Sequence, residues 1–243
     1  MPPTPHSVDG LLLIDKPSGP TSHDVVARIR RHFRMKKVGH GGTLDPMATG
    51  LLVILLGRGT KLSNFVMGTD KIYEGTFRLG LSTSTQDAEG DVVQESDAAA
   101  VTEEQVLLEM KKWLGDIMQT PPMVSAIKKD GVPLYKLARK GITVEREPRL
   151  IHIYSFDLLA FHSPDVDFRL ACTKGTYVRT ICSDLGDALH CGAYLSALRR
   201  TRSGDFSIED AVTLDEALEM KPEELAARVV SPARAHAANR GLA

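Results

Sequence analysis

The chain has 243 residues, of which 42% are hydrophobic and 25% are charged, and its formal net charge is −1. These proportions predict a globular protein that buries a sizeable core, and they exclude a mainly disordered chain. They also exclude a membrane-spanning helix, which needs about 18–20 apolar residues, because the longest apolar run covers only residues 51–56.

The clearest local patterns mark helix starts and strands. Thr21 with Asp24, and Thr102 with Gln105, have the spacing of capping boxes, which begin helices. The run 51–57 is apolar throughout, which predicts a strand buried on both faces. In the first half of the chain we predict a strand at 10–16, a helix at 21–33, a shaped loop at 38–50, strands at 51–57 and 71–81 (with Tyr73, Phe77, Leu79 and Leu81 on one face), a turn at 87–91 and a helix from 102 to about 113. In the second half we predict a short helix closed by Gly141, paired strands at 149–159 and 166–174, a helix at 176–189, a strand or extended piece at 193–200 and a helix from about 213.

Strands that alternate irregularly with helices favour the α+β class over a regular βαβ repeat. We therefore expect a curved mixed or antiparallel sheet flanked by helices and loops. No internal repeat and no clear linker is visible in the sequence. A single domain over residues 1–243, with a basic insertion at about 120–149, is the resulting prediction.

Charge is segregated along the chain although the total is near zero. Residues 28–37 hold six basic residues and no acidic one, and residues 125–150 hold seven basic residues against three acidic ones. Residues 205–224 hold eight acidic residues and one lysine, and an Ala/Arg-rich end follows. Such segregation is typical of a positive face for a polyanion, although each run is also compatible with an ordinary solvated surface. The candidate contacts to such a nucleic-acid backbone, RNA or DNA, are Arg30, Arg31, Arg34, Lys128, Lys136 and Arg139.

One carboxylate stands out in the glycine-rich loop. Asp45 follows Gly41 and Gly42 and directly precedes Pro46. Glycines allow a backbone to approach a ligand closely, and a carboxylate placed there can act as a nucleophile or a base. An aspartate that only hydrogen-bonds its own loop remains the alternative. Neither a P-loop, a GxSxG motif nor a metal-ligand cluster is present in the sequence.

Six blocks of sequence follow one another between residue 10 and residue 200: GLLLIDKPSGPTSHDVV, GHGGTLDPMATGLL, DKIYEGTFRLG, PPMVSAIKKDGVPLYKLARKG, KGTYVRTICSDLG and YLSALRR. Together these blocks resemble one known family, the TruB family of tRNA pseudouridine-55 synthases. The resemblance covers about four fifths of the chain. It implies that one uridine in the T-arm loop of tRNA is isomerised to pseudouridine, with no cofactor and no metal.

The resemblance assigns three catalytic residues. Asp45 matches the catalytic aspartate, Tyr73 the tyrosine that stacks on the target base, and Arg179 the arginine that pairs with the catalytic carboxylate. Pairing with an arginine favours the charged form of a carboxylate. A stacked aromatic ring can hold a detached base while it turns. The step performed by Asp45 stays open: attack on C6 of the base, attack on C1′, or removal of the 2′ proton.

Five further residues match positions that bind the substrate. The resemblance gives His40 as a histidine that inserts into the T loop, Tyr177 as a substrate-contacting tyrosine, Leu198 as a pocket leucine, Lys16 as the lysine of a Lys-Pro motif beneath the active site, and Asp87 as a uridine-contacting aspartate.

The sequence also departs from part of the family. Only about 40 residues follow Arg202, so we expect no complete C-terminal RNA-binding domain of the PUA type, and binding should depend on the T stem-loop. A non-catalytic tRNA-binding chaperone and a guide-RNA-dependent, dyskerin-like enzyme are the alternatives. We expect no obligate protein partner, no membrane association and, from three cysteines without a CxxC pair, a cytoplasmic protein.

Overall fold

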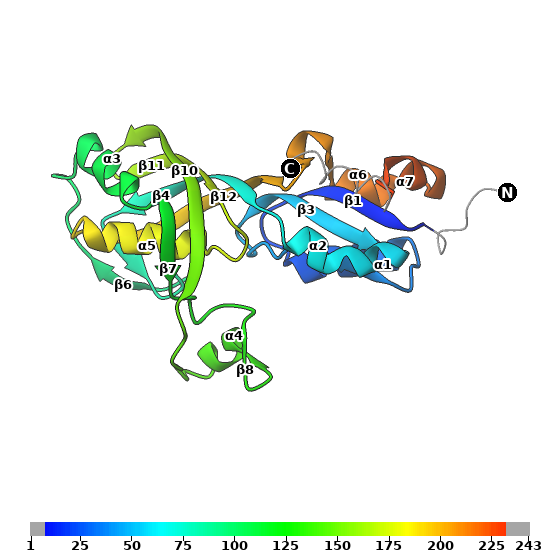
Figure 1. The fold of residues 1–243 in the computed structure, drawn as a ribbon, viewed down its shortest axis with the longest axis horizontal. Helices are drawn as coiled ribbons and strands as arrows, with labels where there is room; N and C mark the ends of the chain where they lie inside the picture. Colours follow the sequence, from blue (N-terminus) through cyan, green and yellow to red (C-terminus); the bar gives the residue numbers. More distant parts are fainter. Residues whose placement is uncertain (1–7, 232–243) are drawn as a thin grey trace. The chain divides into compact units, whose positions relative to one another are not determined.

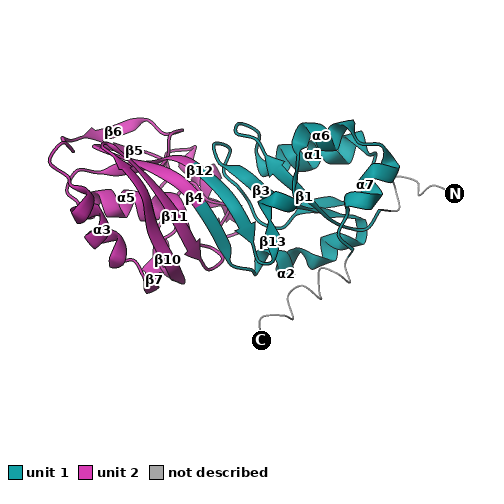
Figure 2. Ribbon diagram, turned by 90° about the horizontal axis from the view of Figure 1, so that it is seen from above, with its two compact units in different colours: residues 1–73, 198–243 teal, residues 74–197 magenta. Residues whose placement is uncertain are grey.

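The computed structural model describes residues 8–231, which form two compact units by their internal contacts (Figure 2). Within this range, unit 1 comprises residues 8–73 and 198–231, and unit 2 comprises residues 74–197. The boundaries cut through two strands, β4 (Lys71–Leu79) and β12 (Ala193–Ser203), so each strand contributes to both units. The single domain expected over residues 1–243 stays a prediction, and the Ala/Arg-rich end beyond Ser231 lies outside the described residues.

Unit 1 is built on a mixed sheet around two apolar strands (Figure 1). β1 (Gly10–Lys16) runs antiparallel to β3 (Thr49–Leu56) in unbroken register. β14 (Val212–Thr213) lies parallel to β1, and the end of β12 lies parallel to β3. The remaining elements of unit 1 are α1 (Ser22–His32), β2 (Val38–His40), the 3-10 helices η2 (Gly57–Leu62) and η3 (Ile208–Asp210), α2 (Ser63–Met67), β13 (Phe206–Ser207), α6 (Leu214–Glu219) and α7 (Pro222–Arg228).

The structure confirms the predicted helix start and the doubly buried strand. Thr21 is the N-cap of α1, and its hydroxyl and the Asp24 carboxylate form the reciprocal capping box. Every residue of 51–56 is at most 1% exposed. The loop prediction for 38–50 was wrong at both ends, because Val38–His40 pair with β3 as β2 and because β3 already begins at Thr49. The glycine-rich composition around β2 predicts a loop. Val38–His40 become a strand because they pair with β3, which is distant in the sequence, and local composition does not encode that pairing.

Unit 2 combines part of the large sheet with three helices, and its strand β10 (Arg149–His162) runs antiparallel to both of its neighbours. β4 and β12 belong to it in part, followed in strand order by β11 (Asp165–Cys172), β10 and β7 (Gly115–Gln119). The predicted pairing of the 149–159 and 166–174 segments is confirmed as β10 and β11. The two helices that contact each other in this unit are α3 (Glu103–Lys111), which begins at the predicted Thr102 cap, and α5 (Val178–Ala188).

Aromatic packing fills the centre of unit 2. Phe168 lies between Phe77, at a ring distance of 5.9 Å, and Phe156, at 5.5 Å and nearly perpendicular. The prediction that Leu81 shares a strand face with Tyr73 was wrong. Gly80 has a φ of +88°, which ends β4, and Leu81 begins a separate hairpin. That hairpin consists of β5 (Leu81–Thr83) and β6 (Val92–Glu95).

The basic insertion connects β7 to β10 and has little regular structure of its own. It contains the two-residue strands β8 (Lys128–Lys129) and β9 (Val132–Pro133), and the short helix α4 (Leu134–Ala138). Figure 1 shows this segment standing off from the strands of unit 2.

The element order and the mixed sheet of the described residues confirm the predicted α+β class.

Candidate active site

In unit 1, Asp45 lies half-buried on the loop 41–48 that joins β2 to β3. Lys16, at the end of β1, is fully buried. Its Nζ donates to the carbonyls of Pro46 at 3.1 Å, Ala48 at 2.7 Å and Pro17 at 2.8 Å. The lysine therefore holds the chain directly after Asp45, and its place beneath an active site stays a prediction.

His40, the last residue of β2, sits at the start of the same loop. Its Nδ1 is buried and makes no hydrogen bond. Burial, followed by the nearby His23 and Arg200, lowers the pKa of His40. His23 lies edge-on to it, with ring centroids 6.2 Å apart. A neutral imidazole of this kind can contact bases without carrying a charge.

Two residues of unit 1 that the resemblance assigns to base binding are buried, and their contact with a base stays a prediction. Tyr73, in β4, is 8% exposed, and Leu198, in β12, is 9% exposed. The Leu198 carbonyl accepts a hydrogen bond from Thr49 Oγ1 at 3.3 Å, where the Asp45 loop enters β3. Leu198 is thus anchored to the end of the loop that carries the carboxylate.

In unit 2, Arg179 and Asp87 form a buried ion pair. Arg179 lies in the first turn of α5 and is 4% exposed, and Asp87 is 1% exposed. The pair joins Arg179 Nη1 to Asp87 Oδ2 at 3.2 Å. Arg179 Nη2 also donates to the Val124 carbonyl, and the Asp87 carboxylate accepts from Thr85 Oγ1 and from the Glu89 N–H. Asp87 thereby fixes the arginine, and a contact between Asp87 and uridine stays a prediction.

Tyr177 is the residue before α5, and it is held by a residue that the sequence did not reveal. Gln119, 4% exposed at the end of β7, accepts from the Tyr177 N–H at 2.8 Å and donates to the Tyr177 carbonyl at 3.0 Å. The Tyr177 ring lies 5.9 Å from the Arg179 guanidinium carbon. A lone glutamine in a short strand carries no sequence signal of this role.

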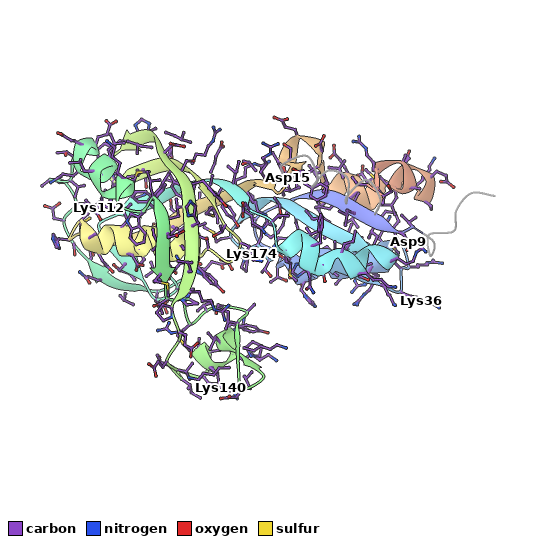
Figure 3. The ribbon with its side chains drawn as sticks, in the orientation of Figure 1. Asp9, Asp15, Lys36, Lys112, Lys140 and Lys174 are labelled. Carbon is purple, nitrogen blue, oxygen red and sulfur yellow. The ribbon has the colours of Figure 1, made fainter. Side chains whose placement is uncertain are left out.

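The basic residues are exposed in both units. Arg30, Arg31 and Arg34 lie on or just after α1 in unit 1, whereas Lys128, Lys136 and Arg139 lie on the insertion of unit 2. Figure 3 shows neighbouring lysines in the same two segments, Lys36 beyond α1 and Lys140 beside α4. Whether the two sets form one positive face, and whether Asp45 pairs with Arg179, stay predictions.

A pH-dependent stability follows from α5. Burial, and then the neighbouring Asp187 carboxylate, raise the pKa of Asp184 to about 6. The unfolded chain releases this proton near about pH 3.9, so the unfolding free energy falls as pH rises from about 4 to about 6. We expect Asp184→Asn to remove this loss and to stabilise the protein by about 1–2 kcal/mol at pH 8, after allowance for solvent screening.

Urea unfolding of wild type and Asp184→Asn at about pH 4.5 and about pH 8 measures this difference. Asp187→Asn is the control. It removes only the neighbouring charge, so it should recover a smaller part of the unfolding free energy that wild type loses at high pH. Parallel pH profiles for wild type and Asp184→Asn would contradict the prediction.

Comparison with known proteins identifies the family. Residues 30–178 match the TruB family pseudouridylate synthase N-terminal domain, and residues 179–235 match the tRNA pseudouridylate synthase B C-terminal domain. The chain therefore belongs to the TruB family of pseudouridylate synthases. The resemblance noted in the sequence and the predicted pseudouridine synthase fold are confirmed.

Named relatives match most of the chain. The tRNA pseudouridine synthase B of Opitutus terrae is 57% identical over 88% of this chain and 89% of its own length. That of Syntrophotalea carbinolica is 50% identical over 94% of this chain and 74% of its own length. A chain in the crystal structure of a Cbf5-Nop10-Gar1 complex superposes with a TM-score of 0.74 and 31% identity over 95% of this chain. The present chain spans 62% of that solved chain's length.

None of the helices within residues 8–231 is long and apolar enough to cross a membrane. Over the same residues, no group of three or more His, Cys, Asp or Glu side chains is placed to hold a metal ion.

Proposed function

We propose that this chain isomerises uridine to pseudouridine at position 55, in the T-arm loop of tRNA, with Asp45 as the catalytic carboxylate. The observation that carries the proposal is the half-buried Asp45 on a loop anchored by the buried Lys16, within a chain 57% identical to a tRNA pseudouridine synthase B. We propose that the protein binds the T stem-loop of tRNA and that it does so in the cytoplasm.

The reaction breaks the bond between N1 and C1′, turns the base, and forms a bond between C5 and C1′. The proton on C5 leaves and N1 gains one, so the product is an isomer and no oxidant, reductant or energy source enters the balance. Asp45 acts on the sugar or on the ring, Arg179 keeps it charged, and Tyr73 retains the free base by stacking. The uridine must leave the folded T loop first, at a cost of a few kcal/mol.

We further propose that the protein acts alone. Identity to the relatives named tRNA pseudouridine synthase B reaches 57%, against 31% for the chain from the Cbf5-Nop10-Gar1 complex. The test is to incubate the purified protein with an unmodified tRNA transcript and to map pseudouridine by carbodiimide treatment and primer extension. A single stop in the T loop is expected. Modification only after a guide RNA or partner protein is added would contradict the proposal.

Replacing Tyr73 separates stacking from chemistry. Tyr73→Phe keeps the ring, so we expect nearly normal tRNA binding, whereas Tyr73→Leu should lose about 1–3 kcal/mol of binding. A Phe variant that binds without turnover would assign the hydroxyl a chemical role, such as proton transfer. Filter binding and single-turnover rates measure both quantities, and equal activity of Tyr73→Leu and wild type would remove Tyr73 from the site.

Salt dependence tests the basic residues of α1. Replacing Arg30, Arg31 and Arg34 together by glutamine should weaken tRNA binding, because phosphate contacts release counterions. Each lost contact should lower the slope of log K against log salt by about 0.7–0.9. Binding of a non-substrate RNA hairpin should weaken similarly, since phosphate contacts carry no sequence information. A salt titration that overlays wild type would leave the insertion as the main basic contact.

A further inference from the structure

The loop 41–48 has no regular structure, yet side chains from distant parts of unit 1 bind its main chain. Ser22, the first residue of α1, is 2% exposed. Its Oγ accepts from the Leu44 N–H at 2.9 Å and donates to the Leu44 carbonyl at 3.0 Å. One hydroxyl therefore satisfies both main-chain groups of the residue directly before Asp45.

Arg200 binds the same loop from the opposite end of the sequence. It is 1% exposed, and its guanidinium donates to three main-chain carbonyls: Nη1 to Thr43 at 3.2 Å, Nη2 to Gly42 at 3.2 Å, and Nε to Leu51 at 2.8 Å. A guanidinium presents its N–H donors in a rigid planar fork, so the directions of these three bonds are fixed together, whereas the donors of a lysine ammonium rotate about one nitrogen.

The surroundings of Arg200 differ from those of the next residue. Within residues 8–231, no carboxylate lies in ion-pair distance of the buried Arg200. Arg199 instead pairs with the Asp15 carboxylate at 2.6 Å and is 42% exposed. Burying a cation without a counter-ion is unfavourable unless its hydrogen bonds are well placed. The carbonyls of Thr43 and Gly42, in the loop that carries Asp45, supply two of the hydrogen bonds that compensate the buried charge of Arg200.

We infer that Ser22 and Arg200 are positioning residues for the reaction, which fix the main chain on the N-terminal side of Asp45 so that its carboxylate meets the uridine in one geometry. The inference rests on the proposed function, because it takes Asp45 as the catalytic residue. Lys16 fixes the C-terminal side, so the loop is held on both sides of the carboxylate. A displacement of about 1 Å at a reacting group can lower a rate about 100-fold.

The test uses Ser22→Ala and Arg200→Lys in the full chain. Ser22→Ala removes one oxygen atom, and Arg200→Lys keeps the charge and loses the fork. We expect the single-turnover rate at saturating enzyme to fall at least tenfold for Ser22→Ala and at least 30-fold for Arg200→Lys. The dissociation constant for tRNA should change by less than threefold in both variants.

Two matched variants control for stability and charge. Thr213→Ala removes the hydroxyl cap of α6, which accepts from the Glu216 N–H, and leaves the loop untouched. Arg199→Lys alters the neighbouring arginine of the same strand. Both should keep the wild-type rate, although Thr213→Ala lowers the melting temperature. A purely structural role for Ser22 would produce the Thr213→Ala result.

The double variant gives the sharpest outcome. Because both residues act through one loop, the loss in Ser22→Ala/Arg200→Lys should be smaller than the product of the single losses. Wild-type single-turnover rates in Ser22→Ala, or a loss matched by an equal loss of tRNA affinity, would overturn the inference. Asp45→Asn is measured in parallel. If Asp45→Asn stays active, the role of Asp45 in the proposed function is wrong, and the result does not bear on whether Ser22 and Arg200 position the loop.

Discussion

Asp45→Asn should lower the single-turnover rate by about 10³–10⁵-fold while tRNA still binds. Asparagine has nearly the same size as aspartate, so the loop can keep its anchors to Lys16 and Ser22. The amide has no negative charge, and it can act neither as a nucleophile nor as a base on the sugar or the ring. The loss therefore falls on the chemical step.

Single-turnover assays with excess enzyme, together with filter binding of tRNA, measure the two quantities. Asp15→Asn is the control, because Asp15 belongs to the same unit and its carboxylate pairs with the partly exposed Arg199 (Figure 3 shows Asp15). Such pairs contribute about 0–1 kcal/mol to stability. Retention of more than about a tenth of the wild-type rate in Asp45→Asn would exclude Asp45 as the catalytic group.

The second large effect is expected at Asp87. Asp87→Asn breaks the buried pair with Arg179 from one side, and such a loss lowers the unfolding free energy by about 3–5 kcal/mol. Arg179 also loses one of the contacts that fix its direction. We therefore expect a loss of single-turnover rate as well, even at temperatures where the variant is fully folded.

Urea unfolding and single-turnover assays on the same preparation measure both effects. Asp165→Asn is the matched control, because the Arg78–Asp165 pair of unit 2 spans 3.5 Å with both side chains exposed. That variant should lose less than about 1 kcal/mol and keep its activity. Equal stability losses in the two variants would show that the buried pair contributes no more than the exposed one.

The helix starts and the long strands could be predicted because their signals are local. The capping box at Thr21 and the apolar run 51–56 each specify one structure without help from distant residues. β2 was missed because its three residues become a strand only by pairing with β3. The division into two units was also invisible, since its boundaries fall inside β4 and β12 and not in a polar linker.

The residues that support the proposed site were harder to foresee than those of the site itself. Motifs pointed to Asp45 and Arg179, whereas Ser22 and Arg200 lie inside the matching blocks of sequence and received no role from them. Gln119 gave no signal at all. Their contacts join segments up to 158 residues apart, as between Arg200 and Gly42, and no local pattern encodes such a contact.

The most direct test of the central claim is release of tritium from a T-arm stem-loop labelled at C5 of its uridines. Formation of the bond between C5 and C1′ expels the hydrogen on C5, so each turnover releases one tritium to water. The account predicts that wild type releases about one equivalent per RNA, from the uridine of position 55 alone, and that Asp45→Asn releases none above background. Binding of the stem-loop by wild type without tritium release would contradict the account and would instead support a tRNA-binding chaperone.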